Sequence, residues 1–217
     1  MNPMLAPVIE NFWWLFLLLS LAALLKLFKP YFKGRFGEFA VAMHVKLYLK
    51  QPHYILMNNL TFEDEQGTTT QIDHLLLSPF GLFVIETKNY KGWIFGGERQ
   101  KMWTQKIYKQ SYKFQNPLHQ NYKHIKVLEQ ILAEILSPEY IHSLVVFMPE
   151  AEFKTAMSEN VFHGASWTDY VKSFQESVIS ETKLKRIQLQ LEKVMLEKSW
   201  QTNRQHVENL KQRKQAK

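Results

Sequence analysis

The sequence predicts a mixed α/β domain behind an apolar N-terminal segment. Three observations support this fold class. Residues 53–62, 68–78 and 82–90 have the composition of strands joined by short turns, helical patterns flank this set, and a further apolar strand pattern follows at 141–149. At 217 residues the chain is long enough for one sizeable core and short for two full domains.

The first apolar segment predicts a membrane-spanning anchor. Residues 12–28 contain a single charge, Lys26, and a bilayer core needs roughly 17 to 25 apolar residues. Glu10 precedes the run and four cations follow it at positions 26, 29, 33 and 35, which is the reverse of a cleaved signal peptide. Positive charge after the span predicts that the C-terminal side is cytoplasmic. A buried core helix or an in-plane helix is the alternative interpretation.

The next helix is predicted at residues 34–50 and carries an acid among apolar side chains. Glu38, Val41, Ala42, Val45 and Leu49 fall on one stripe at helical spacing. A carboxylate directed toward a core is costly unless it is paired or binds a metal. The alternative is that Glu38 lies at the edge of the stripe and meets solvent.

The remaining elements follow from turn and capping signals. A small hairpin is predicted at 92–103 with Gly96 and Gly97 at its turn, and Asn116 and Pro117 predict the start of a helix that runs to about Leu136. An amphipathic helix begins after Ser180. The predicted domains are an anchor at 1–30, a catalytic domain at 31–178, and a C-terminal amphipathic helix with a basic tail at 179–217.

Composition and charge restrict the chemistry. The absence of cysteine excludes disulfide scaffolds, thiol nucleophiles and cysteine-ligated zinc. No two histidines have the spacing of a helical zinc site. The net charge is +7, and residues 99–128 hold seven basic residues, no acidic one and several aromatics. Such a window is typical of a surface that meets phosphates and bases, and a solvated basic helix and loop is the alternative.

Two acids and a lysine lie at the ends of two neighbouring predicted strands. Alternation places Glu86 and Lys88 on one strand face, and a turn at 78–81 would bring Asp73, on the preceding strand, close to Glu86. Adjacent carboxylates repel unless a cation lies between them, and Mg²⁺ accepts one or two carboxylates together with waters and phosphates. The set therefore predicts metal-assisted phosphodiester hydrolysis. For Glu86 and Lys88 alone, a cross-strand ion pair is the alternative. His74, on the face opposite Asp73, is expected to be structural.

Several motifs resemble the nuclease-related domain (NERD) family. They are G-R-F-G-E at 34–38, Q-I-D-H at 71–74, G-L-F-V-I-E-T-K-N-Y-K-G at 81–92, Trp103, and N-P-L-H-Q at 116–120. This family belongs to the PD-(D/E)XK nuclease superfamily, which implies a restriction-endonuclease-like core of a helix, a three-stranded antiparallel meander, a helix and a strand. Over residues 34 to 150 the resemblance implies Mg²⁺- or Mn²⁺-dependent cleavage of nucleic acid, with Glu38, Asp73 and Glu86 as metal ligands and Lys88 positioning the attacking water.

The predicted function is a membrane-anchored, divalent-metal-dependent nuclease that acts on DNA, or on RNA, at the cytoplasmic face. One alternative is a module that keeps the nuclease fold, has lost turnover, and tethers nucleic acid or a partner. Another is a scaffold that binds a partner through its C-terminal helix. The residues predicted to contact nucleic acid are Lys91, Arg99, Lys101, Lys106, Lys109, Lys113 and Gln120.

Overall fold

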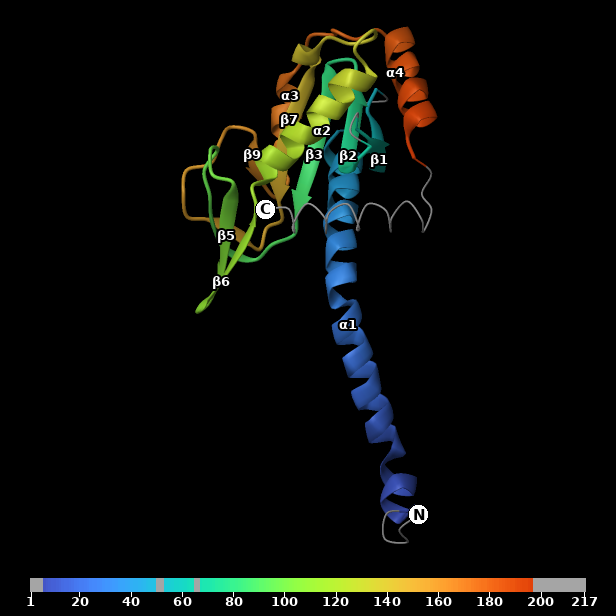
Figure 1. The fold of residues 1–217 in the computed structure, drawn as a ribbon, viewed down its shortest axis with the longest axis vertical. Coiled ribbons are helices and arrows are strands. Elements are labelled where there is room, and N and C mark those ends of the chain that lie inside the picture. Colours follow the sequence, from blue (N-terminus) through green and yellow to red (C-terminus); the bar gives the residue numbers. More distant parts are fainter. Residues whose placement is uncertain (1–5, 50–52, 65–66, 197–217) are drawn as a thin grey trace. The chain divides into compact units, whose positions relative to one another are not determined.

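The computed structural model describes residues 6–49, 53–64 and 67–196 (Figure 1). Within the first helix, side chains are described for residues 13–24 and 37–49. The basic tail predicted after residue 196 lies outside the described residues. The chain divides into two units, residues 1–36 and 37–217, and each is described by itself.

A single helix, α1 (Ala6–Tyr48), carries the predicted anchor and the predicted first helix of the domain. In its described N-terminal part, residues 13–24, the large apolar side chains are exposed, from 43% for Leu15 to 62% for Leu19. No helix among the described residues is long and apolar enough to cross a membrane. The predicted membrane-spanning helix at 12–28 is therefore not confirmed, since only residues 13–24 of it have described side chains and a span needs about 17 or more.

The larger unit is built on a five-stranded mixed sheet. Its strand order is β1-β2-β3-β7-β9, in which the pairs β1–β2 and β2–β3 are antiparallel and the pairs β3–β7 and β7–β9 are parallel. The tight turn between β2 and β3 is closed by Ser78, whose hydroxyl donates to Gly81 O at 2.9 Å and accepts from Phe80 N at 3.2 Å. These strands span Ile55–Glu63 (β1), Thr69–Ser78 (β2), Gly81–Lys88 (β3), Ile141–Phe147 (β7) and Val161–His163 (β9).

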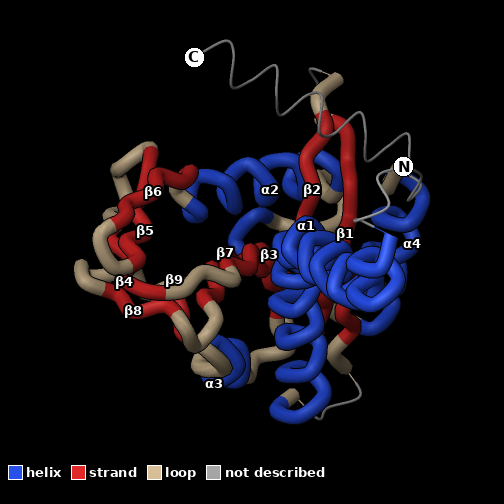
Figure 2. The backbone as a smooth tube through the Cα atoms, turned by 90° about the horizontal axis from the view of Figure 1, so that it is seen from below, coloured by secondary structure: helices blue, strands red, loops and turns tan. Residues whose placement is uncertain are grey.

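Helices cover both faces of this sheet (Figure 2). Helices α2 (Pro117–Ile131) and α4 (Glu181–Val194) pack on one face, where the core includes Leu75, Leu82 and Val84. The last turns of α1 and helix α3 (Trp167–Ser173) pack on the other face against Leu76, Phe83 and Ile85. The fold is thus mixed α/β with buried strands, which explains why the strand sequences are almost continuously apolar.

Helix α2 begins as the sequence predicts. The side-chain oxygen of Asn116 accepts a hydrogen bond from Leu118 N at 2.9 Å, and Pro117 occupies the first helical position. The helix ends at Ile131, five residues before the predicted end at Leu136. Turns and the short 3-10 helix η1 (Pro138–Tyr140) then lead into β7, and the apolar pattern continues because Leu132 and Leu136 remain buried in these turns.

A second, four-stranded sheet lies beside the β7–β9 edge of the first (Figure 2). The predicted hairpin is confirmed as the antiparallel pair β4–β5, but β6 and β8 extend it into a sheet of order β6-β5-β4-β8 that was not predicted. The signal was weak because β6 is mostly polar and β8 has three residues. The strands span Gly92–Phe95 (β4), Met102–Ile107 (β5), Gln110–Gln115 (β6) and Ala151–Phe153 (β8).

The β4–β5 turn provides a test of how tightly this second sheet is packed. A Cβ atom added to Gly96 would lie 2.1 Å from the ring of Trp103, which is 1% exposed, whereas one added to Gly97 would meet nothing nearer than 3.8 Å. We expect Gly96→Ala to lower the free energy of unfolding by roughly 1–3 kcal/mol, because the buried indole cannot move aside. Gly97→Ala is the matched control and should change stability little. Chemical denaturation of both variants checks this, and equal stabilities would contradict it.

Candidate active site

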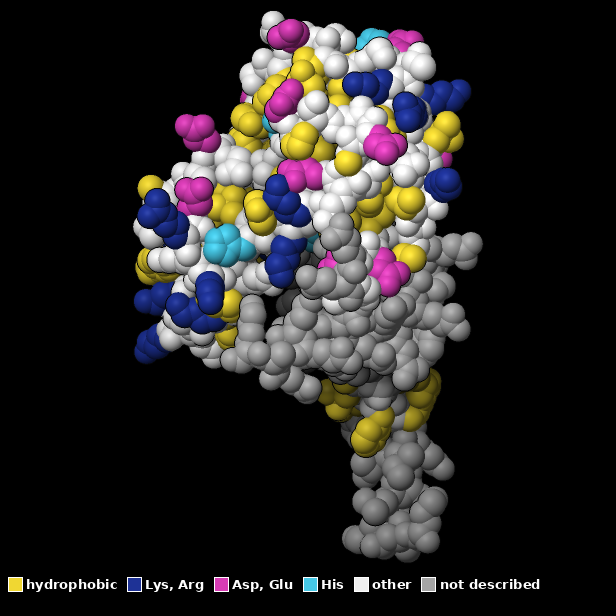
Figure 3. All heavy atoms as spheres, turned by 45° about the horizontal axis from the view of Figure 1, so that its top comes forward, with side chains coloured by type: hydrophobic (Ala, Val, Ile, Leu, Met, Phe, Trp, Pro, Cys, Tyr) yellow, Lys and Arg dark blue, Asp and Glu magenta, His cyan; other side chains and the backbone are white. Residues whose placement is uncertain are grey.

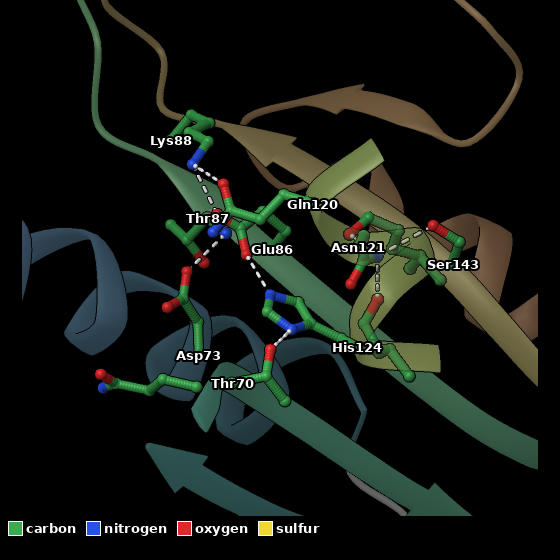
Figure 4. A network of polar contacts seen from close by, with 12 residues as sticks. Thr70, Asp73, Glu86, Thr87, Lys88, Gln120, Asn121, His124 and Ser143 are labelled. Carbon is green, nitrogen blue, oxygen red and sulfur yellow. Dashed lines mark hydrogen bonds and ion pairs between the residues drawn. The ribbon is translucent and has the colours of Figure 1, made fainter. Parts of the chain in front are cut away.

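Two acidic side chains meet where β2 and β3 leave the buried sheet (Figure 4). The antiparallel β2–β3 ladder runs from Ser78–Gly81 to His74–Ile85, so Asp73 and Glu86 each lie one position beyond its last pair. The charge of Glu86 acts on Asp73 and raises its pKa. The predicted proximity of these carboxylates is thus confirmed.

An irregularity in β1 and β2 shapes this part of the sheet. Asn59 has a φ of 55°, in the left-handed region, and the β1–β2 ladder skips the rung that would join Asn59 to Asp73. The alternation of side chains changes phase at this rung. Ile72 and Leu75 enter the same core although they are three positions apart, and a regular strand would place them on opposite faces. The phase change turns Thr70 toward α2.

Glu86 is held from both sides by basic groups. Its carboxylate is 1% exposed, and Oε1 lies 2.5 Å from Lys88 Nζ. Oε2 lies 3.3 Å from His124 Nε2, a distance that permits ion pairing, but it has no hydrogen-bond partner among the described residues. Burial alone would raise the pKa of Glu86, but Lys88 and His124 outweigh it and hold that pKa below its ordinary value. Glu86 is therefore an ionised carboxylate with one oxygen incompletely satisfied.

Lys88 projects from the same strand face as Glu86, as alternation predicts, and meets helix α2. Its Nζ donates to Gln120 Oε1 at 3.1 Å as well as to Glu86, and its side chain is 14% exposed. Burial would lower the pKa of Lys88, but Glu86 outweighs this and the pKa lies above its ordinary value. The ammonium group is thus charged, is oriented by its hydrogen bonds to Glu86 and Gln120, and lies within electrostatic reach of Asp73.

Asp73 has an unusual electrostatic environment. Its Oδ2 accepts a hydrogen bond from Thr87 N at 3.0 Å. Burial, with a further contribution from Glu86, raises the pKa of Asp73 from 3.8 to about 8, against the lowering effects of Thr87 N–H and Lys88. Such a perturbed acid beside a charged lysine is typical of functional sites. Extra positive charge at this point would favour the ionised form.

Glu38, from α1, lies near this pair but has its own partner. Its Oε2 accepts from Asn59 Nδ2 at 2.9 Å, and Asn59 Oδ1 in turn accepts from Gln71 Nε2 at 3.2 Å. Glu38 also contributes to the raised pKa of Asp73. The acid on the apolar stripe is therefore half-buried, paired with an amide, and within electrostatic reach of Asp73.

Sequence analysis missed the role of His124. Its Nδ1 lies 2.8 Å from Thr70 Oγ1 while Nε2 faces Glu86, so this buried ring connects β2 to the carboxylate on β3. A sequence signal existed, since Gln120, Asn121 and His124 share one face of α2 at spacings of three and four. His74 points to the other side of the sheet and contacts Asn58 Oδ1 at 2.6 Å; burial lowers the pKa of His74 to about 4, as suits the predicted structural residue.

Buried Asn121 fixes α2 against the sheet at this point. Its amide donates to Val84 O at 2.9 Å, Ser143 Oγ at 2.9 Å and Leu144 O at 3.2 Å. These contacts tie one turn of the helix to β3 and β7. Gln120 and His124, on either side of Asn121 in sequence, are thereby held over Lys88 and Glu86.

Two residues of the cluster have donor atoms that suit a hard divalent cation. Asp73 and Glu86 offer carboxylate oxygens, one of which is buried without a hydrogen-bond partner among the described residues. Mg²⁺ is commonly held by one or two carboxylates and several waters. Among the described residues no group of three or more acids and histidines converges tightly enough to hold a metal, so Glu38 stands outside the pair in this arrangement.

The predicted nucleic-acid contacts divide into two groups. Gln120 lies in the cluster, bonded to Lys88. The basic residues lie instead on or beside the second sheet, and Figure 3 shows Lys and Arg side chains gathered over the part of the molecule where β5 and β6 lie. The predicted basic contacts are Lys91, Arg99, Lys101, Lys106, Lys109 and Lys113. Lys106 is half-buried and the other five are exposed.

Comparison with known proteins assigns the family. The sequence profile of the nuclease-related domain matches residues 33–148, more than half of the chain and all of the cluster described above. The chain belongs to the NERD family. An uncharacterized protein of Bacillus anthracis is 38% identical to it over 165 residues, which cover 76% of this chain and 74% of that protein. Among solved structures there is no match.

NERD membership establishes a nuclease-related domain and suggests interaction with nucleic acid and use of a divalent metal. The NERD match begins before Glu38 and ends just after β7. It therefore contains Asp73, Glu86, Lys88 and the helix that carries Gln120 and His124. The second sheet falls inside it except for β8.

The raised pKa of Asp73 predicts a specific pH dependence of stability. Between pH 3.8 and about 8 the folded state binds a proton that the unfolded state has lost, so the free energy of unfolding falls as the pH rises through this range. Asp73→Asn removes the charge and retains an acceptor for Thr87 N–H. In EDTA we expect the variant to be more stable than wild type by roughly 1–3 kcal/mol at pH 9, with a smaller difference at pH 4. Urea denaturation at the two pH values measures this, and a difference independent of pH would contradict it.

Proposed function

We propose that this NERD protein hydrolyses phosphodiester bonds of DNA with the help of a divalent metal ion. The observation that carries the proposal is the placement of two carboxylates, Asp73 and Glu86, beside the charged ammonium of Lys88 at the end of a buried sheet. Family membership supports a nuclease-related chemistry. A module that keeps the fold and binds DNA without cutting it is the competing function.

Each residue of the cluster has a separate task in this proposal. Asp73 and Glu86 would hold Mg²⁺ or Mn²⁺, and Glu38 would act from outside this pair, through a water. When bound, such an ion polarises a phosphoryl oxygen and lowers the pKa of a coordinated water. Lys88 orients the attacking water and stabilises the negative charge that develops on the phosphate.

Helix α2 positions these groups without touching the reacting atoms. Gln120 holds the ammonium of Lys88 at 3.1 Å, which limits the directions that Nζ can take. His124, fixed by Thr70, lies against Glu86 and restricts the rotation of its carboxylate. Preorganisation of this kind contributes to catalysis because the charged groups need not rearrange as the reaction proceeds.

The basic residues of the second sheet would hold the DNA backbone. Residues 99–128 carry seven basic side chains and no acidic one, so this segment attracts phosphates. We assign phosphate contacts to the predicted group, Lys91, Arg99, Lys101, Lys106, Lys109 and Lys113. These contacts are insensitive to sequence, since they reach the backbone rather than base edges.

A cleavage assay tests the nuclease. The full-length protein is incubated with DNA and with RNA in Mg²⁺, Mn²⁺ or EDTA, alongside Asp73→Ala and Lys88→Ala. We expect metal-dependent cleavage of DNA that falls by about 10²-fold or more in both variants. Asp169→Ala and Lys172→Ala are matched controls, because these two residues form an exposed ion pair on α3, outside the proposed machinery. Wild-type binding without any cleavage would favour the binding module instead.

Metal binding has a readout that does not depend on activity. Mg²⁺ binds the folded state, so it should raise the unfolding temperature of the wild-type protein in proportion to occupancy. Asp73→Asn should show no such rise, although in EDTA it is the more stable protein. A rise of equal size in the variant would remove Asp73 from the metal site.

We further propose that the apolar segment at 12–28 attaches the protein to a membrane and leaves the rest of the chain in the cytoplasm. The support is the exposure of large apolar side chains between residues 13 and 24, together with the cations that follow. Fractionation of cells that express the full chain should find it in the membrane pellet after alkaline carbonate extraction. Recovery in the supernatant would overturn the anchor.

A further inference from the structure

The outer face of the second sheet carries an aromatic residue that the catalytic proposal does not use. In β4, Ile94 is buried in the core, and alternation turns its neighbour Trp93 outward, where it is 44% exposed. A large aromatic side chain in this position offers apolar surface whose burial by a ligand would be favourable. Trp93 is paired with Lys106 on β5 and Glu152 on β8, so it lies in the middle of this face.

Cations surround the exposed indole. Lys106 Nζ lies 5.7 Å and Lys154 Nζ 4.8 Å from the ring centroid of Trp93. Farther along the same face, Lys113 on β6 donates to Thr104 on β5 at 2.8 Å. Contacts of cations with exposed rings are weak and easily exchanged. Lys154 is itself ion-paired with Glu152, the exposed acid beside Trp93 on β8. The face therefore presents an aromatic surface with a cation, Lys106, on its β5 side and an ion pair on its β8 side.

A second aromatic residue stands at the tip of the β5–β6 hairpin. Tyr108 occupies the two-residue turn between Ile107 and Gln110, is 93% exposed, and has a φ of 53°. Bulky residues are strained at such a φ, and glycine would be the residue expected in this conformation. Tyr108 is thus both exposed and conformationally unfavourable, and strain of this kind is often kept where a side chain makes an external contact.

This face is physically linked to the active site. Trp93 lies five positions after Lys88, which limits the distance between their Cα atoms to about 18 Å. Gln105 Nε2 donates to Lys91 O at 2.8 Å, and a Cβ atom on Gly92 would come within 2.6 Å of Lys106 O, so β5 packs closely on the β3–β4 link. A ligand lying on the sheet would have one end near the catalytic cluster.

We propose that this outer face, with Trp93 at its centre and Tyr108 at its edge, binds unpaired bases of a single-stranded DNA segment next to the scissile bond. The inference rests on the proposed function and specifies its substrate. Exposed rings gain most from bases whose faces are free, because duplex bases are already stacked and present only their edges in the grooves. The lysines would hold phosphates in either case and so do not distinguish the two forms of DNA.

Binding measured in EDTA tests this proposal separately from cleavage. Fluorescence anisotropy gives the affinity of the full-length protein for a labelled single strand and for the duplex of the same sequence. We expect Trp93→Ala and Tyr108→Gly each to weaken single-strand binding by about tenfold and to leave duplex binding nearly unchanged. Trp93→Phe should retain most of the affinity because it keeps a ring. Tyr48→Ala, which removes a similarly exposed ring from α1, is the matched control.

The outcomes separate the two proposals. Unchanged single-strand affinity in Trp93→Ala, or an equal loss for single strand and duplex, would overturn the base-stacking face. Tyr108→Gly suits the backbone conformation of the turn, so its effect reports the ring rather than misfolding. If the wild-type protein binds single strands through Trp93 but never cuts DNA with any metal, the face is supported and the nuclease fails. If the wild-type protein cuts DNA while Trp93→Ala binds single strands normally, the nuclease is supported and the base-stacking face fails.

Discussion

The repulsion between two carboxylates at the end of a buried sheet is the constraint on which the site depends. Asp73 and Glu86 lie just beyond the last β2–β3 pair, where water is scarce, so their charges must be offset by the protein or by a bound cation. In this structure Lys88 and His124 stabilise the charge of Glu86, while Asp73 tends to keep its proton. That asymmetry leaves one acid that would ionise more readily if positive charge came near it.

Helix α2 joins this constraint to the rest of the molecule. Buried Asn121 fastens the helix to β3 and β7, and buried Asn116 caps its start while donating to the carbonyls of Gly97, Glu98 and Gln100 in the β4–β5 turn. Helix α2 thus positions Gln120 and His124 over the acids, and it also holds the basic β4–β5 turn of the second sheet in place. The acid cluster and the second sheet are therefore both anchored to the same helix.

Much of the cluster of Asp73, Glu86 and Lys88 could be read from local sequence, because both alternation along a strand and pairing across a tight turn are set by spacing. Glu86 and Lys88 had to share a face, and the turn after Ser78 had to bring Asp73 toward Glu86. The helix cap at Asn116 followed from equally local chemistry. The phase change beside Asn59 was not predictable in this way, since an asparagine at positive φ inside a strand leaves no pattern in composition.

The sequence by itself determined the family, the mixed α/β class and the acid pair, because these depend on motifs and periodicities that span a few residues. Only the tertiary structure decided that His124 meets Glu86, that Glu38 pairs with Asn59, and that a polar segment such as β6 joins a second sheet. Those contacts join residues distant in the chain, and they form because buried charges and unpaired strand edges must find partners wherever the packing places them.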